Sequence, residues 1–267
     1  MYGEEARMKK IRTLLAFEGR RMLTSKSTLI YVIIYFISYI ISVIFFQLYG
    51  SDGSVLTEAS AQSFPIQHLQ AGILFTGTFI AIYVAQITRQ ERTQSTIKLI
   101  LLRPVSRLQY YISKILSIAF FSMLLTLIQI TVGYLVGMLF FGWHGTLVFG
   151  DIVTSGLTGV GITFLSGVAF AFAYFAFGML MMLLSEFLPR LIDCAAVGIV
   201  ILLIGQYAEV LPSIRPYVLV HQMLFFHQDI FEMSAVYNLR SAIVILAYCL
   251  ACSFAGYYVF RHEDLSV

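Results

Sequence analysis

Residues 89–114, RQERTQSTIKLILLRPVSRLQYYISK, form a polar and basic island between two long apolar runs. The island holds six Lys and Arg residues but only one acid, Glu91. An apolar run of about 20 residues is long enough to cross a hydrocarbon core of about 30 Å as a helix that rises 1.5 Å per residue. If the flanking runs cross a membrane, the island is where the protein meets a soluble partner or the lipid surface.

The composition of the whole chain places it in a membrane. Of its 267 residues, 59% are hydrophobic and 12% are charged, whereas soluble domains have about 25% charged residues. So little charge cannot cover a water-soluble surface. The apolar runs are continuous and lack the short alternating strands of a transmembrane barrel. The sequence therefore predicts an all-α polytopic membrane protein.

The order of the apolar runs predicts a single transmembrane domain with six helical spans over residues 1–267. The N-terminal segment, residues 1–27, mixes basic and apolar side chains at helical spacing and predicts an amphipathic helix in the membrane interface. The predicted spans are 28–49, 66–88, 110–141, 152–184, 194–211 and 239–260. A loop at 89–109 carries the island, a short turn is expected at 142–151, and 212–238 predicts short helices outside the membrane.

The basic residues are distributed unevenly between the two sides of such a six-span protein. With both termini on one side, 15 of the 17 Lys and Arg residues fall on that side, and Arg215 and Arg240 fall on the other. By the positive-inside rule, the termini and the island face the cytoplasm. This orientation in the plasma membrane accounts for the net charge of +3 without a nucleic-acid partner.

The sequence contains no pattern that indicates an enzyme. It has no Walker A motif, no HExxH and no GxSxG. His221 and His227 with Asp229 fit no standard metal spacing, so we expect no metal and no cofactor. Acids are missing from the centres of the spans, whereas ion-coupled carriers keep ionisable groups there. A transporter of this kind must receive its energy from another protein at its cytoplasmic surface.

The island resembles a pattern found in ABC-2 type transporter permeases. In that pattern a Glu, a Gly-Thr pair, an apolar run, a Pro and a Ser-Arg pair precede a Lys at the start of the third span. The matching residues here are Glu91, Thr96, Leu101, Leu102, Pro104, Ser106, Arg107 and Lys114. Ser95 stands where the family usually has Gly. The basic N-terminal segment with Phe17-Glu18, the six spans and the short helices before the last span also resemble the family.

The resemblance implies a permease that works with a separate ATP-binding cassette subunit and with a second permease copy or paralogue. In such exporters the interface helix and the loop after the second span contact the ATPase, and the substrate path follows the first, second and fifth spans. The implied docking residues are Phe17, Glu18, Arg20, Arg21, Glu91, Arg92, Thr96, Lys98, Leu99, Leu102, Arg103, Pro104 and Arg107.

Three alternatives remain open at this point. The basic residues of the island could act only as topological anchors. The chain could be a membrane-embedded accessory protein or enzyme acting on lipid or peptide, although it shows no convergent set of polar groups. It could also be an ion-coupled secondary carrier, which the missing central acids disfavour.

Overall fold

Long helices make up almost all of the structure, a computed structural model that describes residues 19, 20, 22–51, 56, 58–90, 106–143, 145–150, 152–188 and 190–262. The helices are α2 (Lys26–Tyr49), α3 (Phe64–Ala71), α4 (Ile73–Ala85), α7 (Arg107–Phe141), α8 (Leu157–Ser185), α9 (Leu191–Tyr207), α10 (Leu219–Glu232) and α11 (Ala235–His262). A π-helical turn, Gln86–Gln90, continues α4, and short 3₁₀ turns lie at Ala208–Val210 and Arg215–Tyr217. The strands β1 (Leu147–Phe149) and β2 (Ile152–Thr154) form one antiparallel hairpin.

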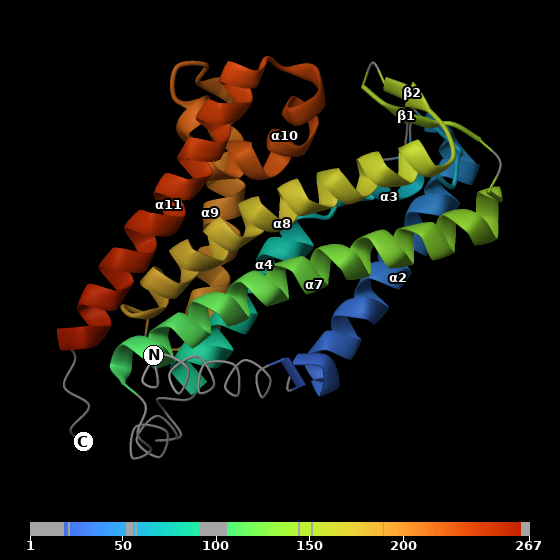
Figure 1. Cartoon of the computed structure of the whole chain (residues 1–267). Coiled ribbons are helices and arrows are strands. Elements are labelled where there is room, and N and C mark those ends of the chain that lie inside the picture. Colours follow the sequence, from blue (N-terminus) through green and yellow to red (C-terminus); the bar gives the residue numbers. More distant parts are fainter. Residues whose placement is uncertain are drawn as a thin grey trace, which may run out of the picture.

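The predicted fold class, an all-α polytopic membrane protein, is confirmed. Five helices are long and apolar enough to cross a membrane, and α3 with α4 makes a sixth span if the bent pair is taken as one. Helices suit this environment because each one pairs its own backbone groups where no water is present. At 35 residues α7 is about 52 Å long at 1.5 Å per residue, so it crosses the bundle at a steep tilt (Figure 1).

Two predicted spans differ from the structure. The span predicted at 66–88 is broken at Gly72, where α3 and α4 meet at an angle of 60°. The span predicted at 152–184 begins only at Leu157, because Ile152–Thr154 pairs with Leu147–Phe149 in the hairpin instead of a simple turn at 142–151. Gly156, with a φ of 66°, then turns the chain into α8.

The remaining boundaries differ by a few residues. Helix α7 begins at Arg107, so the last residues of the predicted loop 89–109 are already helical. Helix α9 begins at Leu191 and ends at Tyr207, whereas 194–211 was predicted. Within 212–238, α10 is one amphipathic helix, and α11 already begins at Ala235.

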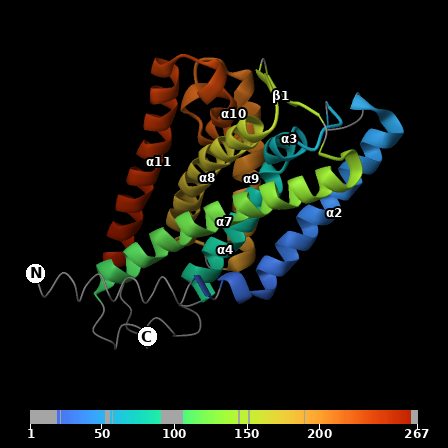
Figure 2. The ribbon, with the colours of Figure 1, turned by 45° about the vertical axis from the view of Figure 1, so that its right-hand side comes forward.

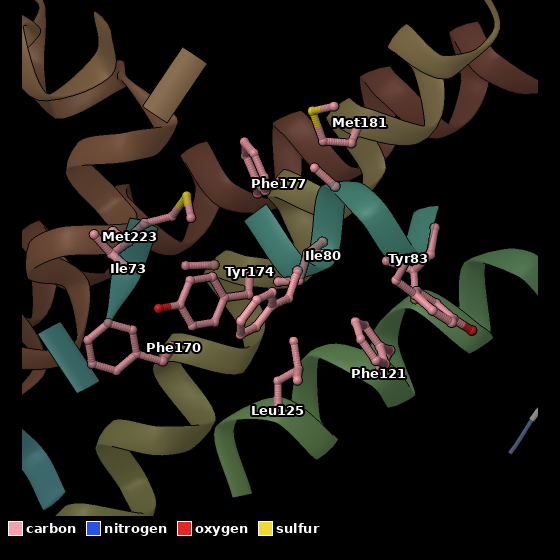
Figure 3. Close-up of a cluster of buried hydrophobic side chains, with 14 of the residues drawn as sticks. Ile73, Ile80, Tyr83, Phe121, Leu125, Phe170, Tyr174, Phe177, Met181 and Met223 are labelled. Carbon is pink, nitrogen blue, oxygen red and sulfur yellow. The ribbon is translucent and has the colours of Figure 1, made fainter. Parts of the chain in front are cut away.

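Helix α8 lies at the centre of the core. It packs against α7, α11, α10 and α4. Figure 3 shows Phe170, Tyr174 and Phe177 of α8 directed toward Ile73 and Ile80 of α4. Gly178 lets the helices come this close, because a methyl group there would overlap Ile118 of α7 and press on Ile80.

The hairpin, α3 and α10 lie at one end of the bundle, and the start of α7 and the end of α11 lie at the other (Figures 1 and 2). The hydroxyl of Ser63, just before α3, donates to the carbonyl of Thr146 at 3.1 Å and accepts from the amide of Val148 at 2.9 Å. These bonds hold the hairpin against the start of α3. We call the end with the hairpin the outer end and the opposite end the inner end.

Candidate functional site

Both described ends of the island lie at the inner end of the bundle. The π-helical turn after α4 and the first turns of α7 meet there, in a small hollow lined by Ile87, Thr88, Tyr110, Lys114 and Glu186, among others. A second hollow joins the start of α2 to the same turn, with Met22, Ser25, Ser27 and Thr28 facing Gln86 and Ile87. The described residues on either side of 91–105 therefore both lie at this end.

Helix α7 begins with a capping box. The Ser106 hydroxyl accepts a bond from the Gln109 amide at 3.2 Å, and the Gln109 side chain accepts from the Ser106 amide at 3.0 Å. This reciprocal pair satisfies two backbone donors that the first helical turn leaves open. Ser106 of the family pattern, together with Gln109, thus sets the residue at which the helix begins.

Arg107 ties this start to the end of the last helix. Its guanidinium donates to the carbonyl of Arg261 at 2.8 Å. Next to it, Tyr110 and Tyr111 pack on Phe260 with ring centroids 5.7 and 5.9 Å apart. The inner ends of α7 and α11 therefore form one unit.

Lys114 does not behave as a surface charge of the island. The side chain is only 2% exposed and lies over the Tyr110 ring, with Nζ 5.2 Å from the ring centroid. It shares its hollow with Glu186, which follows the last residue of α8. A buried ammonium group needs an acid or a π-face close by. Lys114 therefore belongs to the packed start of α7 and not to the exposed surface of the island.

Most of the docking residues implied by the resemblance lie outside the described residues. They are Phe17, Glu18, Arg21, Glu91, Arg92, Thr96, Lys98, Leu99, Leu102, Arg103 and Pro104. The apolar stretch at 96–102, TIKLILL, also predicts a short helix under the membrane, and it too lies outside the described residues. The two that are described, Arg20 and Arg107, are exposed and half-buried, respectively. Arg20 belongs to the short segment before α2, where its carbonyl accepts a bond from Thr24.

The outer end carries a group of polar residues on and around α10. His221 Nδ1 lies 2.8 Å from Glu209 Oε1, which links α10 to the end of α9. His227 is 1% exposed and stacks on Phe170 at 4.2 Å. Among the described residues, no three His, Cys, Asp or Glu side chains are grouped so that they could hold a metal. His221 and His227 thus hold α10 in place by a hydrogen bond to the Glu209 carboxylate and by stacking.

The burial of His227 makes the stability of this end depend on pH. Burial lowers the pKa of His227 to about 3 from its ordinary value of 6.5. Between these values the unfolded chain binds a proton that the folded chain does not, so stability falls as the pH drops below about 6.5. We expect a loss of about 1–2 kcal/mol between pH 7 and pH 5. His227→Phe should remove this part of the loss.

The measurement is thermal unfolding of both proteins in detergent at pH 7 and pH 5. Burial also raises the pKa of Asp229, which acts in the opposite sense but is present in both proteins and cancels in the comparison. His262→Phe, at an exposed position at the inner end, serves as the control and should keep the wild-type slope. An unchanged slope in His227→Phe would contradict the prediction.

Comparison with known proteins identifies the family. Residues 14–188 match the family model described as ABC-2 family transporter protein. The chain belongs to the ABC-2 transporter family. It is therefore a multi-pass membrane protein of the permease type. Over 72 residues it is also 40% identical to the uncharacterized protein YhcI of Bacillus subtilis (strain 168), a stretch that makes up 27% of this chain and 23% of YhcI.

In this ABC-2 family chain, sequence reasoning found some of the small residues that bring the helices close and missed others. Small residues let helices approach closely in lipid, so the sequence predicts close packing at four glycines of the fourth span, Gly156, Gly159, Gly161 and Gly167. Gly159 and Gly167 do pack closely, against Gln62 and Ile130, whereas a side chain at Gly156 or Gly161 would meet open space. Two glycines were not predicted to be packing residues: Gly133 and Gly137 of α7. The start of α3 packs directly on them. Their GxxxG spacing was a readable signal.

Sequence reasoning also missed the break at Gly72. Gln129 lies inside an apolar run, which predicts a hydrogen bond between helices, and its amide lies against the Tyr39 hydroxyl of α2 in agreement with this. The same side chain also contacts Gly72 at the break. A single Gly inside an apolar run does not by itself predict a break in the helix, because the break depends on the side chains that pack against that Gly.

Proposed function

We propose that the chain is the permease subunit of an ATP-driven exporter, energised by a separate ATP-binding cassette subunit. Family membership over residues 14–188 carries the proposal. The chain itself has no P-loop and no recognisable catalytic motif, so the energy for transport has to come from a partner. A single transmembrane domain with six spans in the cell membrane is part of this proposal.

The proposed docking surface combines the N-terminal segment with the loop 89–109. The geometry of the inner end supports it, because the start of α2, the π-helical turn and the start of α7 converge there. Arg107 then connects the loop to α11. A partner that pushes on the loop would therefore act on three spans at once: on α4 through the turn, and on α7 and α11 through Arg107.

The inner end is proposed to face the cytoplasm, with both termini on that side. The described basic residues support this orientation. Arg20, Lys26, Arg107, Lys114, Arg190 and Arg261 belong to the inner end, and Arg215 and Arg240 belong to the outer end. Such an asymmetry is the pattern that sets orientation during insertion. Arg240 is held over the Tyr217 ring at 4.5 Å.

The substrate path is proposed to lie between this chain and a second permease copy or paralogue. Large apolar side chains cover the outward faces of α2 and α9, among them Ile33, Ile37 and Ile41 on α2 and Ile204 and Tyr207 on α9. These faces are available for lipid or for a second subunit. Along α2 and α9 these faces would follow the first and fifth of the spans that the resemblance implies, whereas α4, in the second span, is mostly buried.

Co-expression tests the proposal directly. The chain is produced with candidate ATP-binding cassette subunits, purified in mild detergent and reconstituted in nanodiscs. We expect a complex of two permeases and two ATPase subunits, whose ATP hydrolysis exceeds that of the free ATPase subunit. If no ATPase subunit associates with or without ATP, while the chain alone transports a solute down an ion gradient in liposomes, the proposal is wrong and a secondary carrier takes its place.

A further inference from the structure

A groove of about 370 Å³ lies between three elements at the outer end of the bundle. Its walls are Ile66, Gln67, Gln70 and Ala71 of α3, Val148, Phe149 and Gly150 of the hairpin, and Gln228 of α10. Figures 1 and 2 show these elements gathered at this end, away from the inner end. Sites for small molecules have volumes of about 300–1,000 Å³. The groove can therefore hold a small molecule or one unit of a larger one.

The three walls are fixed to one another, so the groove exists before any ligand arrives. Ser63 holds the hairpin against the start of α3 by two hydrogen bonds. The Phe149 ring of the hairpin packs on His227 and Phe231 of α10, with ring centroids 5.5 and 6.0 Å away. A site that is formed in advance loses little conformational entropy when a ligand binds.

Glu232 orients the side-chain amide of Gln228. The Nε2 atom of Gln228 donates to both carboxylate oxygens of Glu232, at 2.9 and 3.0 Å. Glu232 in turn packs against Gly150, where a side chain would overlap the carboxylate. Because the NH₂ group of Gln228 is bonded in this way, its Oε1 atom remains to accept hydrogen bonds. The α10 wall thus presents an acceptor.

Gln70 supplies a carboxamide on the α3 wall. Its side chain is half-buried, and no hydrogen bond joins it to another residue in the described part of the chain. A carboxamide carries two donors and an acceptor oxygen, so it can both give and accept hydrogen bonds. Gln67, one turn earlier on the same helix, lines the groove as well. Two different walls therefore carry carboxamides.

The rest of the groove favours an uncharged ligand with hydroxyl groups. Val148, Phe149 and Ala71 give it an apolar surface, and none of the described residues that line it is charged. An ionic ligand would lose its hydration there without gaining an opposite charge. A sugar ring combines hydroxyls, which donate and accept, with faces of C–H groups that pack on apolar side chains. Amides beside an apolar surface match this combination.

The edge of β1 disfavours a peptide as the ligand. A peptide that adds a strand to a hairpin needs free backbone groups along one edge. On the edge of β1 that faces α3, the Val148 amide donates to the Ser63 hydroxyl at 2.9 Å, and the Thr146 carbonyl accepts from the same hydroxyl at 3.1 Å. These backbone groups are taken, so the groove offers side-chain amides instead.

We propose that this groove is a binding site for an uncharged sugar unit on the outer face of the membrane. The sugar hydroxyls donate to Gln228 Oε1 and exchange hydrogen bonds with the Gln70 amide, while a C–H face lies on the apolar surface beside Phe149. A free saccharide and the headgroup of a glycolipid offer the same hydroxyls. The site takes only its outward orientation from the proposed function, and the ATPase subunit has no part in binding.

The test uses the full chain without an ATPase subunit, in phosphatidylcholine nanodiscs. The chain is purified in a detergent without a sugar headgroup, because a maltoside would compete for the groove. The soluble probes are maltose, cellobiose and N,N′-diacetylchitobiose, with trialanine and spermidine to represent peptides and cations. Saturation-transfer difference NMR measures their binding. In a second arm the nanodiscs also contain diglucosyldiacylglycerol, and native mass spectrometry compares its retention with that of phosphatidylcholine.

We expect saturable binding of a soluble sugar, selective retention of the glycolipid, or both, and no binding of trialanine or spermidine. Gln70→Met and Gln228→Met keep an unbranched side chain but remove the amide, so each should weaken binding about 2- to 10-fold. Ala71→Phe, at an exposed position in the groove wall, should abolish binding by filling the groove. Gln206→Met makes the same change on α9, outside the groove, and should leave binding unchanged. Thermal unfolding checks that all four variants fold.

The two arms identify the source of the sugar: a soluble probe alone indicates a free saccharide, and the glycolipid alone indicates a lipid headgroup. No binding in either arm would overturn the site. Binding of trialanine or spermidine in place of a sugar would also overturn it, as would sugar binding that Ala71→Phe and both Gln variants leave intact. Each of these results would leave the proposed function untouched. Sugar binding to a chain that no ATPase subunit joins would count against the proposed function only.

Discussion

Charge reversal at both Arg92 and Arg103 is expected to abolish ATP-driven transport while the protein still inserts and folds. Both residues belong to the island that we propose as the docking surface, between the π-helical turn and Arg107. Electrostatic contacts between subunits depend on complementary charge, and like charges placed in contact cost several kcal/mol. We expect binding of the ATPase subunit to weaken at least about tenfold, which corresponds to about 1.4 kcal/mol.

The measurement combines ATPase affinity on nanodiscs with transport in liposomes. Arg215→Glu with Arg240→Glu is the matched control, because it reverses the same number of charges at the outer end. That control should keep both affinity and transport, although Arg240 loses its contact with the Tyr217 ring. Wild-type affinity and wild-type transport in the Arg92→Glu, Arg103→Glu protein would refute the docking role and leave the island as a topological anchor.

Adding a side chain at Gly133 is expected to destabilise the protein strongly. The Cβ of Gly133→Ala would lie 2.9 Å from the Cα of Pro65, so backbone rather than a flexible side chain has to move. Overpacking of this kind costs about 1–3 kcal/mol, and Gly133→Leu should cost more. Thermal unfolding in detergent should show an apparent Tm lowered by about 2–4 °C for each kcal/mol.

Gly161 offers the matched control on α8. A methyl group there has nothing within 4 Å, so Gly161→Ala should leave the Tm unchanged or raise it through the better helix propensity of Ala, worth about 0.5–1 kcal/mol. Both positions lie inside long helices, so the gain in helix propensity from Gly to Ala is the same at each. The difference in Tm between the two variants therefore reports the cost of overpacking. Equal Tm values for Gly133→Ala and Gly161→Ala would show that α3 does not rest closely on α7.

The sequence predicted the membrane class and family because those follow from local properties. Apolar length makes a helix in lipid, and the pattern from Glu91 to Lys114 is contiguous. The start of α7 could also be predicted approximately, because Ser106 and Gln109 form a capping box from residues close in the sequence. Helix ends also depend mainly on local sequence, so the predicted and observed helix ends differ by only a few residues. The docking residues that the pattern implies remain a prediction.

The positions that the sequence did not predict depend on contacts between distant segments. Lys114 was counted among the island charges, but it is buried beside Glu186, which is 72 positions later in the chain. His221 suggested a metal only weakly, and its partner Glu209 comes from another element. Residues 152–154 read as the start of a span, yet their pairing with 147–149 made them a strand.

The sequence by itself determined that this protein is a helical membrane protein of the ABC-2 family, because hydrophobic length and a contiguous motif need no knowledge of the fold. The tertiary structure alone decided that the second span bends at Gly72. At the bend Gly72 contacts the Gln129 side chain of α7, and Gly133 of α7 lies under Pro65 of α3. Contacts of this kind form only when segments distant in the sequence pack against one another.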